Sequence, residues 1–405
     1  SSNGLEKRPK LRFPGFDEPW KAIHLSDVGE ASSGFGFPDA YQGEETSEIP
    51  FYKVSDMNLP KNTKVMQQSN NYVSQSTAKK LRVRPFSENA IVFAKVGAAI
   101  SHERKRIALS PFLIDNNMMA FTPKQKEDLE FIYHLFQKIK LSKYSQVGAL
   151  PSYNASDILD IRTFYPTSGN ERKKIVTILN LVDNRIGKQS EIITNLKKYK
   201  RGLQNRFFFK HSQLSPKASE IDSHDVKPLG SVVHINPKTG SLPEAFIYID
   251  LECVESGVLN SKKLISRNSA PSRAQRLLAE GDLLYQMVRP YQKNNYYFQK
   301  AFEYPTVAST GYAQIRCSKM DTQFIYEQLS SDYFAREAML RSTGTGYPAI
   351  NADDLAEIPI WVPPLNQQEK IGAALSFLGA KIEVHQKLLS ALCSVKSSLL
   401  QQLFI

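Results

Sequence analysis

The sequence predicts an α+β protein in which two similar globular domains are separated by two long helices that form an antiparallel coiled coil. The first observation is that the stretches 171–208 and 367–404 align without a gap at a shift of 196 residues. The second is that both stretches carry a heptad pattern of apolar residues, which is typical of long coiled-coil helices. The third is that the segments before them, 148–166 and 345–363, also align. The chain therefore has an internal pseudo-twofold duplication, and 405 residues are enough for about two or three domains with cores of their own.

The first half begins with an extended, proline-punctuated segment that leads to Trp20. Strand-like apolar runs follow at 49–54, 90–94 and 107–113, with Gly, Pro and Asn between them. The run DLEFIYHLFQKIK, Asp128–Lys140, has the periodicity of a short amphipathic helix. These elements predict a compact domain of mixed strands and helices ahead of the first long helix.

The same plan repeats after a polar stretch that lacks periodicity. AFIYIDL, residues 245–251, matches PFYKVSD, residues 50–56, and Phe324-Ile-Tyr matches Phe131-Ile-Tyr. The globular halves diverge more than the helices do, which suggests a common frame carrying two different recognition surfaces. We expect a first domain over 1–165, a first spacer helix over 166–210, a linker over 211–225, a second domain over 226–363 and a second spacer helix over 364–405.

The two long helices should meet along a seam of apolar residues. A 4,3 spacing persists in each for about five heptads, whereas two ordinary amphipathic helices on separate cores would not require so long a stripe. Polar residues interrupt the seam at matched positions, Gln189 with His385 and Lys200 with Lys396, and such residues weaken a seam but fix its register. The predicted seam consists of Ile175, Leu179, Val182, Ile186, Gln189, Ile193, Leu196, Leu203, Ile371, Leu375, Leu378, Ile382, His385, Leu389, Leu392 and Leu399.

An antiparallel pairing also predicts a register. If Gln189 and His385 lie near the centre of the pair, Ile175 faces Leu399. By the same offset, Leu203 faces Ile371. Parallel helices, or helices packed on separate cores, would contradict this prediction.

Composition excludes several classes of protein. Hydrophobic content of 41% and charged content of 23% are those of a soluble globular protein, and no stretch approaches the roughly 18 uninterrupted apolar residues of a membrane helix. Three cysteines, at 253, 317 and 393, lie far apart and form no CxxC pair. Their spacing argues against a disulfide framework or a zinc site and fits a reducing, cytoplasmic location.

No catalytic motif is recognisable. The sequence contains no phosphate loop, no G-x-G-x-x-G, no H-E-x-x-H and no G-x-S-x-G. It also lacks the Asn-Pro-Pro-Tyr type of signature of amino-methylating enzymes, and its seven histidines have no ligand-like spacing. We therefore expect no catalytic residue, no metal site and no cofactor bound by this chain.

Basic residues interleaved with polar and aromatic ones point instead to a polyanion partner. The net charge is +12 and the pI is near 9.3. Arg and Lys suit phosphates and guanine edges, while Asn and Gln can pair with adenine, although any one such residue is as often a solvated loop residue. The candidate DNA-binding residues are Lys79, Lys80, Arg82, Arg84, Arg104, Lys105, Arg106, Arg267, Arg273, Arg276, Arg289, Gln292, Lys293 and Asn294.

Several motifs together resemble a known family. Pro363-Pro-Leu-Asn-Gln-Gln-Glu-Lys-Ile opens the second helix and Lys396-Ser-Ser-Leu-Leu-Gln-Gln-Leu-Phe ends it, while Leu11-Arg-Phe-Pro-Gly-Phe and Ser309-Thr-Gly-Tyr support them. With the duplication, these stretches resemble the specificity (S) subunit of Type I restriction–modification systems, over nearly the whole chain. Each motif is weak alone, but their order makes the resemblance strong.

The resemblance implies a non-catalytic DNA-binding subunit. Its two target recognition domains would each read one half of a bipartite DNA sequence, and its helices would bind two methyltransferase (M) subunits. Restriction and translocation (R) subunits would join in the full complex, and S-adenosylmethionine and ATP would bind to the partner subunits.

Two other functions are compatible with parts of the sequence. A non-catalytic coiled-coil scaffold that binds proteins would be indifferent to DNA even with M present. A self-sufficient nuclease or methyltransferase would act alone, and the missing motifs disfavour it.

Overall fold

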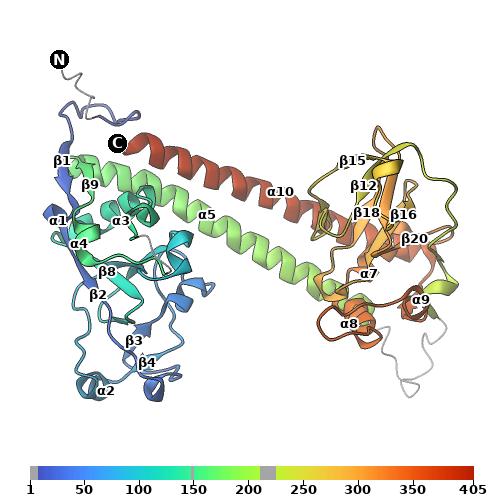
Figure 1. Ribbon diagram of the computed structural model, residues 1–405, viewed down its shortest axis with the longest axis horizontal. Coiled ribbons are helices and arrows are strands. Elements are labelled where there is room, and N and C mark those ends of the chain that lie inside the picture. Colours follow the sequence, from blue (N-terminus) through green and yellow to red (C-terminus); the bar gives the residue numbers. More distant parts are fainter. Residues whose placement is uncertain (1–7, 147–149, 210–224) are drawn as a thin grey trace. The chain divides into compact units, whose positions relative to one another are not determined.

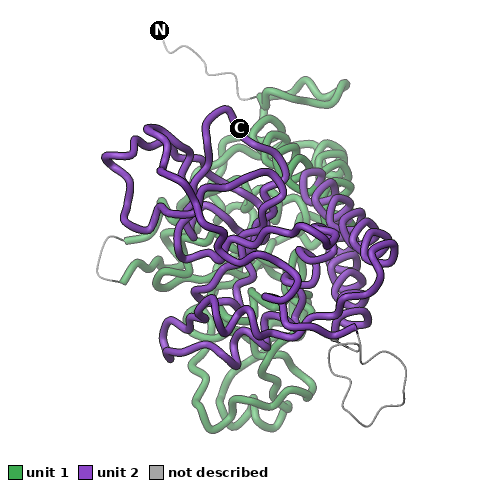
Figure 2. The backbone as a smooth tube through the Cα atoms, turned by 90° about the vertical axis from the view of Figure 1, so that its right-hand side faces the viewer, with its two compact units in different colours: residues 1–188, 389–405 green, residues 189–388 purple. Residues whose placement is uncertain are grey.

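The computed structural model describes residues 8–146, 150–209 and 225–405, so the linker predicted over 211–225 lies outside the described residues except for its last residue. The chain forms two compact units, residues 1–188 with 389–405 (unit 1) and residues 189–388 (unit 2), coloured separately in Figure 2. Two long helices, α5 (Gly169–Gln204) and α10 (Leu365–Leu403), each contribute residues to both units. Each unit therefore combines a globular part with one end of each long helix.

The described residues of the globular part of unit 1 form three small sheets. An antiparallel pair joins β1 to β9, a four-stranded antiparallel sheet has the order β2-β8-β5-β6, and a three-stranded sheet has the order β4-β3-β7 with β3 and β7 parallel. The strands are β1 (Lys21–His24), β2 (Gly29–Ser33), β3 (Ile49–Tyr52), β4 (Tyr72–Val73), β5 (Ala90–Ala94), β6 (Lys105–Ala108), β7 (Leu113–Ile114), β8 (Met118–Pro123) and β9 (Arg162–Tyr165). In the part of unit 1 that the structure describes, short α-helices accompany these strands: α1 (Leu25–Val28), α2 (Gln75–Lys80), α3 (Leu129–Lys138) and α4 (Ala155–Leu159).

Two of the expected strands differ in detail. The run predicted at 49–54 ends as a strand at Tyr52, and a short 3₁₀ helix, Val54–Asn58, begins two residues later. The run predicted at 107–113 is divided between β6, which pairs with β5, and β7, which pairs with β3. One apolar run thus serves two sheets, which hydrophobicity alone does not reveal.

Unit 2 follows the sheet plan of unit 1, but its described residues add a fourth strand to the mixed sheet and a two-stranded sheet of β13 and β14. β10 pairs with β21, a four-stranded sheet has the order β11-β20-β17-β18, and a second has the order β15-β12-β19-β16 with β12 and β19 parallel. The strands are β10 (Val226–Pro228), β11 (His234–Ile235), β12 (Ala245–Ile249), β13 (Val254–Glu255), β14 (Val258–Leu259), β15 (Lys263–Ser266), β16 (Ala274–Leu277), β17 (Asp282–Gln286), β18 (Tyr296–Phe298), β19 (Thr306–Ser309), β20 (Tyr312–Arg316) and β21 (Pro359–Trp361). Its helices are α7 (Thr322–Leu329), α8 (Asp332–Leu340) and α9 (Ala352–Ala356).

The end of one long helix and the start of the other enter the core of each unit. In unit 1, the Trp20 ring lies 6.4 Å from Phe131 and 6.2 Å from Phe404, the penultimate residue, so β1, α3 and the end of α10 share one core (Figure 1). In unit 2, Phe208 lies 5.6 Å from Phe324. Because truncating a buried Phe costs about 3–5 kcal/mol, these rings attach the helices firmly to the globular parts.

Within each unit the two helices run antiparallel, as predicted. In unit 1, Ile175 and Leu179 of α5 belong to the same buried cluster as Leu399 and Leu400 of α10. The order of these contacts along the two helices is opposite, because Asp183 pairs with Lys396 at 2.6 Å.

Unit 2 shows the same arrangement from the other ends of the helices. Leu203 of α5 packs with Ile371 and Leu375 of α10. Gln189 Nε2 lies 2.7 Å from His385 Nδ1 and donates to the His385 carbonyl oxygen at 2.9 Å. The predicted pairing of these two polar residues is therefore confirmed, and every predicted seam residue is buried or half-buried.

Candidate nucleic-acid interface

Unit 1 exposes a group of cations around α2. The helix is capped by Ser74, whose Oγ accepts from the Thr77 backbone at 3.1 Å, and its last turn carries Lys79 and Lys80. Arg82 and Arg84 follow in a turn, where Arg82 has a positive φ of 55°. All four side chains are exposed, so this part of unit 1 offers a compact cluster of positive charge.

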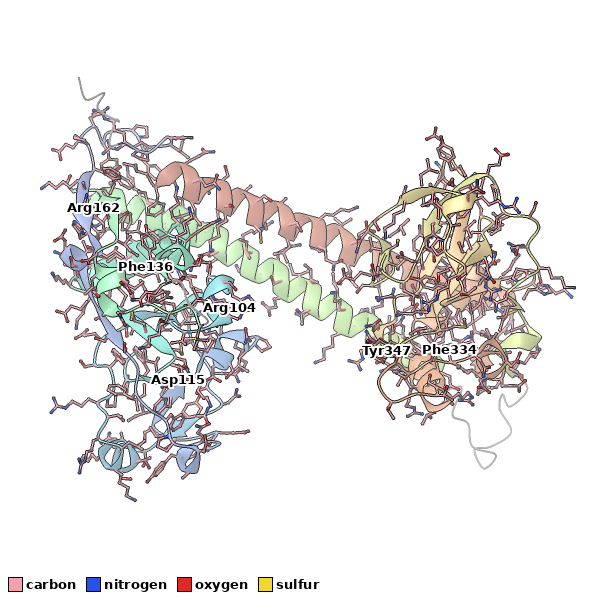
Figure 3. All side chains as sticks on the ribbon, in the orientation of Figure 1. Arg104, Asp115, Phe136, Arg162, Phe334 and Tyr347 are labelled. Carbon is pink, nitrogen blue, oxygen red and sulfur yellow. The ribbon has the colours of Figure 1, made fainter. Side chains whose placement is uncertain are left out.

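The second basic run of unit 1 is largely internal. Lys105 is only 2% exposed, and its ammonium donates to Glu103 and to the Ile139 carbonyl at 3.0 Å. Arg106 donates to the backbone carbonyls of Asn62 and Met57. Burial lowers the pKa of both groups. We therefore withdraw Lys105 and Arg106 as DNA contacts, because both side chains hold loops together. Arg104, labelled in Figure 3, is half-buried.

In unit 2, two of the predicted arginines lie on exposed loops between strands. Arg267 follows β15, and its backbone N–H donates to Glu244 at 2.7 Å. Arg273 precedes β16, and its carbonyl accepts from the Thr310 N–H at 2.8 Å. Arg276 lies on β16 itself and is half-buried, and burial lowers the pKa of its guanidinium. Arg267 and Arg273 thus remain free to meet a ligand, whereas Arg276 is partly enclosed.

The polar residues of the turn after β17 mostly stabilise the turn. Gln286 Nε2 donates to Gln292 Oε1 at 2.8 Å, and Gln286 Oε1 accepts from the Asn294 N–H at 3.1 Å. Asn294 Oδ1 accepts from the Ser256 N–H at 2.9 Å, and Lys293 forms an ion pair with Asp332. Lys293 and Asn294 are therefore committed to internal contacts, which the sequence did not indicate.

Arg289 in the same turn has a different environment. Its guanidinium lies over the ring of Tyr347, with 4.2 Å between the guanidinium carbon and the ring centroid. Tyr347, which is labelled in Figure 3, is 70% exposed by its accessible surface. Sequence reasoning included Arg289 but missed Tyr347. The signal was present in the aligned segments 148–166 and 345–363, where Leu150 stands at the position of Tyr347.

The candidate residues do not converge on a single site. They form an exposed cluster at α2 in unit 1, and in unit 2 the exposed loop arginines and the turn after β17. Among the described residues, no group of three His, Cys, Asp or Glu side chains could hold a metal ion. No helix in the described part of the chain is long and apolar enough to cross a membrane.

A repeated frame that carries different polar loops on each copy defines a class of protein that recognises a composite target. The family model for the "Type I restriction modification DNA specificity domain" matches residues 17–198 and again residues 226–393. The chain therefore belongs to the family of Type I restriction–modification specificity subunits. Subunits of this family provide DNA specificity and are not catalytic, which favours the predicted function over the scaffold alternative.

Curated relatives and solved structures agree with this assignment. The MjaIX specificity subunit of Methanocaldococcus jannaschii is 21% identical over 407 residues, covering 95% of this chain and 92% of that protein. The MjaVIII specificity subunit of the same organism is 25% identical over 297 residues, covering 68% of this chain and 69% of that protein. The fold resembles the crystal structure of the Type I S subunit from M. genitalium, with a TM-score of 0.62, 16% identity and coverage of 98% and 99% of the two chains.

Proposed function

We propose that each unit reads one half of a bipartite duplex target, and that the chain carries two copies of a methyltransferase subunit to that target. The observation that carries the first part is the contrast between frame and loops. The sheets, the buried aromatic residues and the helix seam occur in both units, whereas the exposed cations do not correspond. Two different surfaces on one frame suit two different half-sequences better than a palindrome.

Unit 1 would approach its half-site with the cations at α2, and unit 2 with the loops that carry Arg267 and Arg273. Arg and Lys contacts to phosphates position a protein on DNA, while bidentate contacts to base edges supply discrimination. Among the candidates, the exposed arginines are best suited to reading bases, because their guanidinium groups are not bound by other side chains of the residues that the structure describes.

The second part of the proposal rests on a line of exposed apolar residues along each long helix. On α5 these are Leu181, Ile192 and Tyr199, which are 64%, 41% and 59% exposed. A spacing of 11 and then 7 residues returns to one face of an α-helix. In ordinary helices that face solvent, such positions are polar.

The line is duplicated with the frame. At a shift of 196 residues, Leu181, Ile192 and Tyr199 correspond to the following residues of α10: Phe377, Leu388 and Val395, which are 68%, 40% and 49% exposed. A shallow depression beside Tyr199, lined by Asn195, Lys198, Gly202 and Leu203, is almost wholly apolar. A surface present twice suits a partner present twice, and the partner of a specificity subunit that must be present for DNA modification is the methyltransferase subunit.

Cofactor chemistry would then lie on the partners. S-adenosylmethionine would bind to the methyltransferase subunits, and ATP to the restriction and translocation subunits when these join. We place the assembly in the cytoplasm, where the cell's own DNA would be its substrate.

The first experiment maps the target. The chain is co-expressed with its methyltransferase partner, and methylated bases in the host DNA are located by sequencing. We expect one bipartite sequence. In the Arg273→Ala variant, the preference within one half should relax by about 1–3 kcal/mol while the other half is unchanged. Lys319→Ala, which removes an exposed cation of unit 2 that is not among the candidate residues, is the control. No sequence preference with the partner present would contradict the proposal.

The second experiment counts partners by native mass spectrometry. Tyr199→Glu and Val395→Glu each place a charge in one copy of the apolar line, so each should lower the number of bound methyltransferase subunits from two to one. Thr194→Glu and Ser390→Glu are matched controls, because they add the same charge at equivalent exposed positions about 140–200° away around each helix. Two bound subunits in all four variants would contradict the assignment of this surface.

A further inference from the structure

The turn after β17 holds an arginine where the duplicated frame favours glycine. Arg289 has φ 55° and ψ 59°, the left-handed region, and precedes a short 3₁₀ helix, Pro290–Gln292. The matching position in unit 1 is Gly97, with φ +77°, which also precedes a 3₁₀ helix. The two turns share their anchor, since the Arg289 N–H donates to the Pro348 carbonyl at 2.7 Å and the Gly97 N–H to the Pro151 carbonyl at 2.8 Å.

A side chain at this position carries a conformational cost. Residues with a Cβ adopt the left-handed region at a penalty that glycine avoids, and such positions concentrate at functional sites. Unit 1 shows that glycine satisfies the turn. The arginine of unit 2 is therefore not required by the fold, and its side chain needs another explanation.

The residue that faces this position also differs between the two units. Tyr347 lies beneath the guanidinium, while the aligned residue in unit 1 is Leu150, close enough that a Cβ on Gly97 would lie 3.4 Å from its Cδ1. Unit 2 thus carries an Arg–Tyr pair where unit 1 carries Gly–Leu. Tyr347 and Leu150 are 70% and 64% exposed, so both pairs lie at the surface of their unit.

The Arg289 guanidinium is held in position but its hydrogen-bonding capacity is unused. Its Nε is buried and has no hydrogen-bond partner among the described residues, which also show no ion pair of Arg289, so the two terminal amino groups are the donors it can offer to a ligand. Stacking on the Tyr347 ring engages the face of the planar guanidinium and leaves its edge available. A free, oriented fork is unusual for an arginine that serves only stability.

The surrounding turn is rigid. Gln286 bridges Gln292 and the Asn294 backbone, Asn295 Oδ1 accepts from the Gln286 N–H at 2.9 Å, and Lys293 is anchored to Asp332. Backbone bonds link this turn to the Arg273 loop, since the Met287 N–H donates to the Gly311 carbonyl at 3.0 Å and the Thr310 N–H to the Arg273 carbonyl. Ordering a side chain before binding removes part of the entropy cost of a contact.

We propose that Arg289, held by Tyr347, reads a guanine in the half-site of unit 2 through the O6 and N7 atoms of its major-groove edge. This inference rests on the proposed function, because it assumes that unit 2 meets duplex DNA. The guanidinium fork matches the two acceptors of guanine, and no other base offers that pair in the major groove. Unit 1 has no such reader at the matched position, because Gly97 and Leu150 offer no donor there.

The test uses the complex with the methyltransferase partner and the duplex defined by methylation mapping. Each guanine of the half-site is replaced in turn by 7-deazaguanine, which lacks N7, and by inosine, which keeps N7 and O6 and lacks only the minor-groove amine. In the wild type, one 7-deazaguanine position should weaken binding about tenfold or more, while inosine at the same position should not.

Arg289→Gly is the decisive variant, because the fold of unit 1 shows that glycine is accommodated in this turn. We expect it to bind the intact duplex at least as weakly as the wild type binds the 7-deazaguanine duplex, because it loses the contacts to both O6 and N7, and to be insensitive to the substitution. Arg289→Lys should lose the same discrimination because it replaces a fork by a point charge. Tyr347→Phe should retain discrimination and Tyr347→Ala should reduce it.

Two outcomes would overturn the inference while leaving the proposed function intact. If Arg289→Gly weakens binding equally for all sequences and lowers the slope of log affinity against log salt by about one, the arginine contacts a phosphate. If Arg289→Gly changes neither affinity nor preference, the stacked pair is only structural. By contrast, a wild-type complex without sequence preference would contradict the proposed function itself.

Discussion

Each unit has a lysine at the same position of the helix seam, but the carboxylate that pairs with this lysine comes from a different element in each unit. Lys396 in unit 1 and Lys200 in unit 2 are equivalent at the shift of 196 residues, and each interrupts the apolar seam. Lys396 Nζ pairs with Asp183 on the facing helix at 2.6 Å. Lys200 Nζ pairs with Glu327 on α7 at 2.9 Å. The residue of unit 2 that corresponds to Asp183 is Gly379, which has no side chain to offer.

The exchange is reciprocal, because the residue of unit 1 that corresponds to Glu327 is a histidine. His134 is buried, and its Nε2 lies 2.9 Å from the Asn180 amide oxygen. Burial lowers the pKa of His134 to about 4, so the ring is neutral at pH 7. A neutral ring cannot balance the charge of Lys396, which pairs with Asp183 instead. The comparison teaches that a cation in the seam requires one nearby carboxylate, and that either neighbouring element can supply it.

The largest expected effect is the loss of the carboxylate in unit 2. Glu327 is 1% exposed and also accepts from Gln204 at 3.0 Å, so Glu327→Gln removes the buried carboxylate that pairs with the half-buried Lys200. We expect a loss of about 3 kcal/mol in the free energy of unfolding of unit 2. The measurement is urea denaturation followed by Trp361 fluorescence in a Trp20→Phe background. Glu369→Gln, at an exposed site of α10, should change little, and equal losses in both variants would contradict the prediction.

The second variant tests whether the two solutions are interchangeable. Adding Gly379→Asp to Glu327→Gln rebuilds in unit 2 the pairing found in unit 1. A Cβ at Gly379 would lie 3.2 Å from Lys200 Nζ, and the flexible end of the lysine can move to accept a carboxylate. We expect the double variant to recover at least half of the lost stability, or about 1.5–2 kcal/mol. A double variant less stable than Glu327→Gln alone would show that the geometry of unit 2 excludes the alternative.

The equivalent change in unit 1 should have a smaller effect. Asp183→Asn removes the partner of Lys396. The side chains of the two lysines are equally exposed, at 20%, but that of Asp183 is 13% exposed and that of Glu327 only 2%, so water already reaches more of the pair in unit 1. We expect a loss of about 2 kcal/mol in unit 1, measured by Trp20 fluorescence in a Trp361→Phe background. Asn184→Asp, one residue along and exposed, is the control for the change in amide and carboxylate chemistry. A loss as large as that of Glu327→Gln would contradict the role given to exposure.

The smallest effect concerns pH and distinguishes the units. The His134 pKa lies near 4 in the folded protein and near 6.5 when unfolded, so unfolding takes up a proton below pH 6.5. The neutral ring's contribution to the free energy of unfolding is fully present above pH 6.5 and is lost as pH falls toward 4. The loss between pH 7 and pH 5.5 is about 1 kcal/mol. The free energy of unfolding of unit 1, measured by urea denaturation with Trp20 fluorescence, should therefore fall more between pH 7 and 5.5 in the wild type than in the His134→Gln variant. If this free energy falls equally with pH in both proteins, His134 is not responsible.

Much of the frame was predictable from the sequence by itself. Duplication is visible because matched residues recur at a constant shift, and heptads because a helix places every third or fourth residue on one face. The antiparallel register was a hypothesis drawn from the two polar seam residues Gln189 and His385, since buried polar groups are usually hydrogen-bonded to a partner. Membership of the family rested on motifs that are local in sequence, such as Pro363-Pro-Leu and the end of α10.

The tertiary structure alone decided which side chains meet across long sequence distances. Lys105 and Lys79 look alike in the sequence, yet one is buried against Glu103 and the other is exposed. The partner of Lys200 lies 127 residues away, and the contact of Arg289 with Tyr347 joins two different loops. A basic run shows that charge is present, but whether a cation is free depends on the distance to carboxylates and carbonyls brought close by packing. Because those distances arise only when the sheets and helices have assembled, local sequence patterns do not determine them.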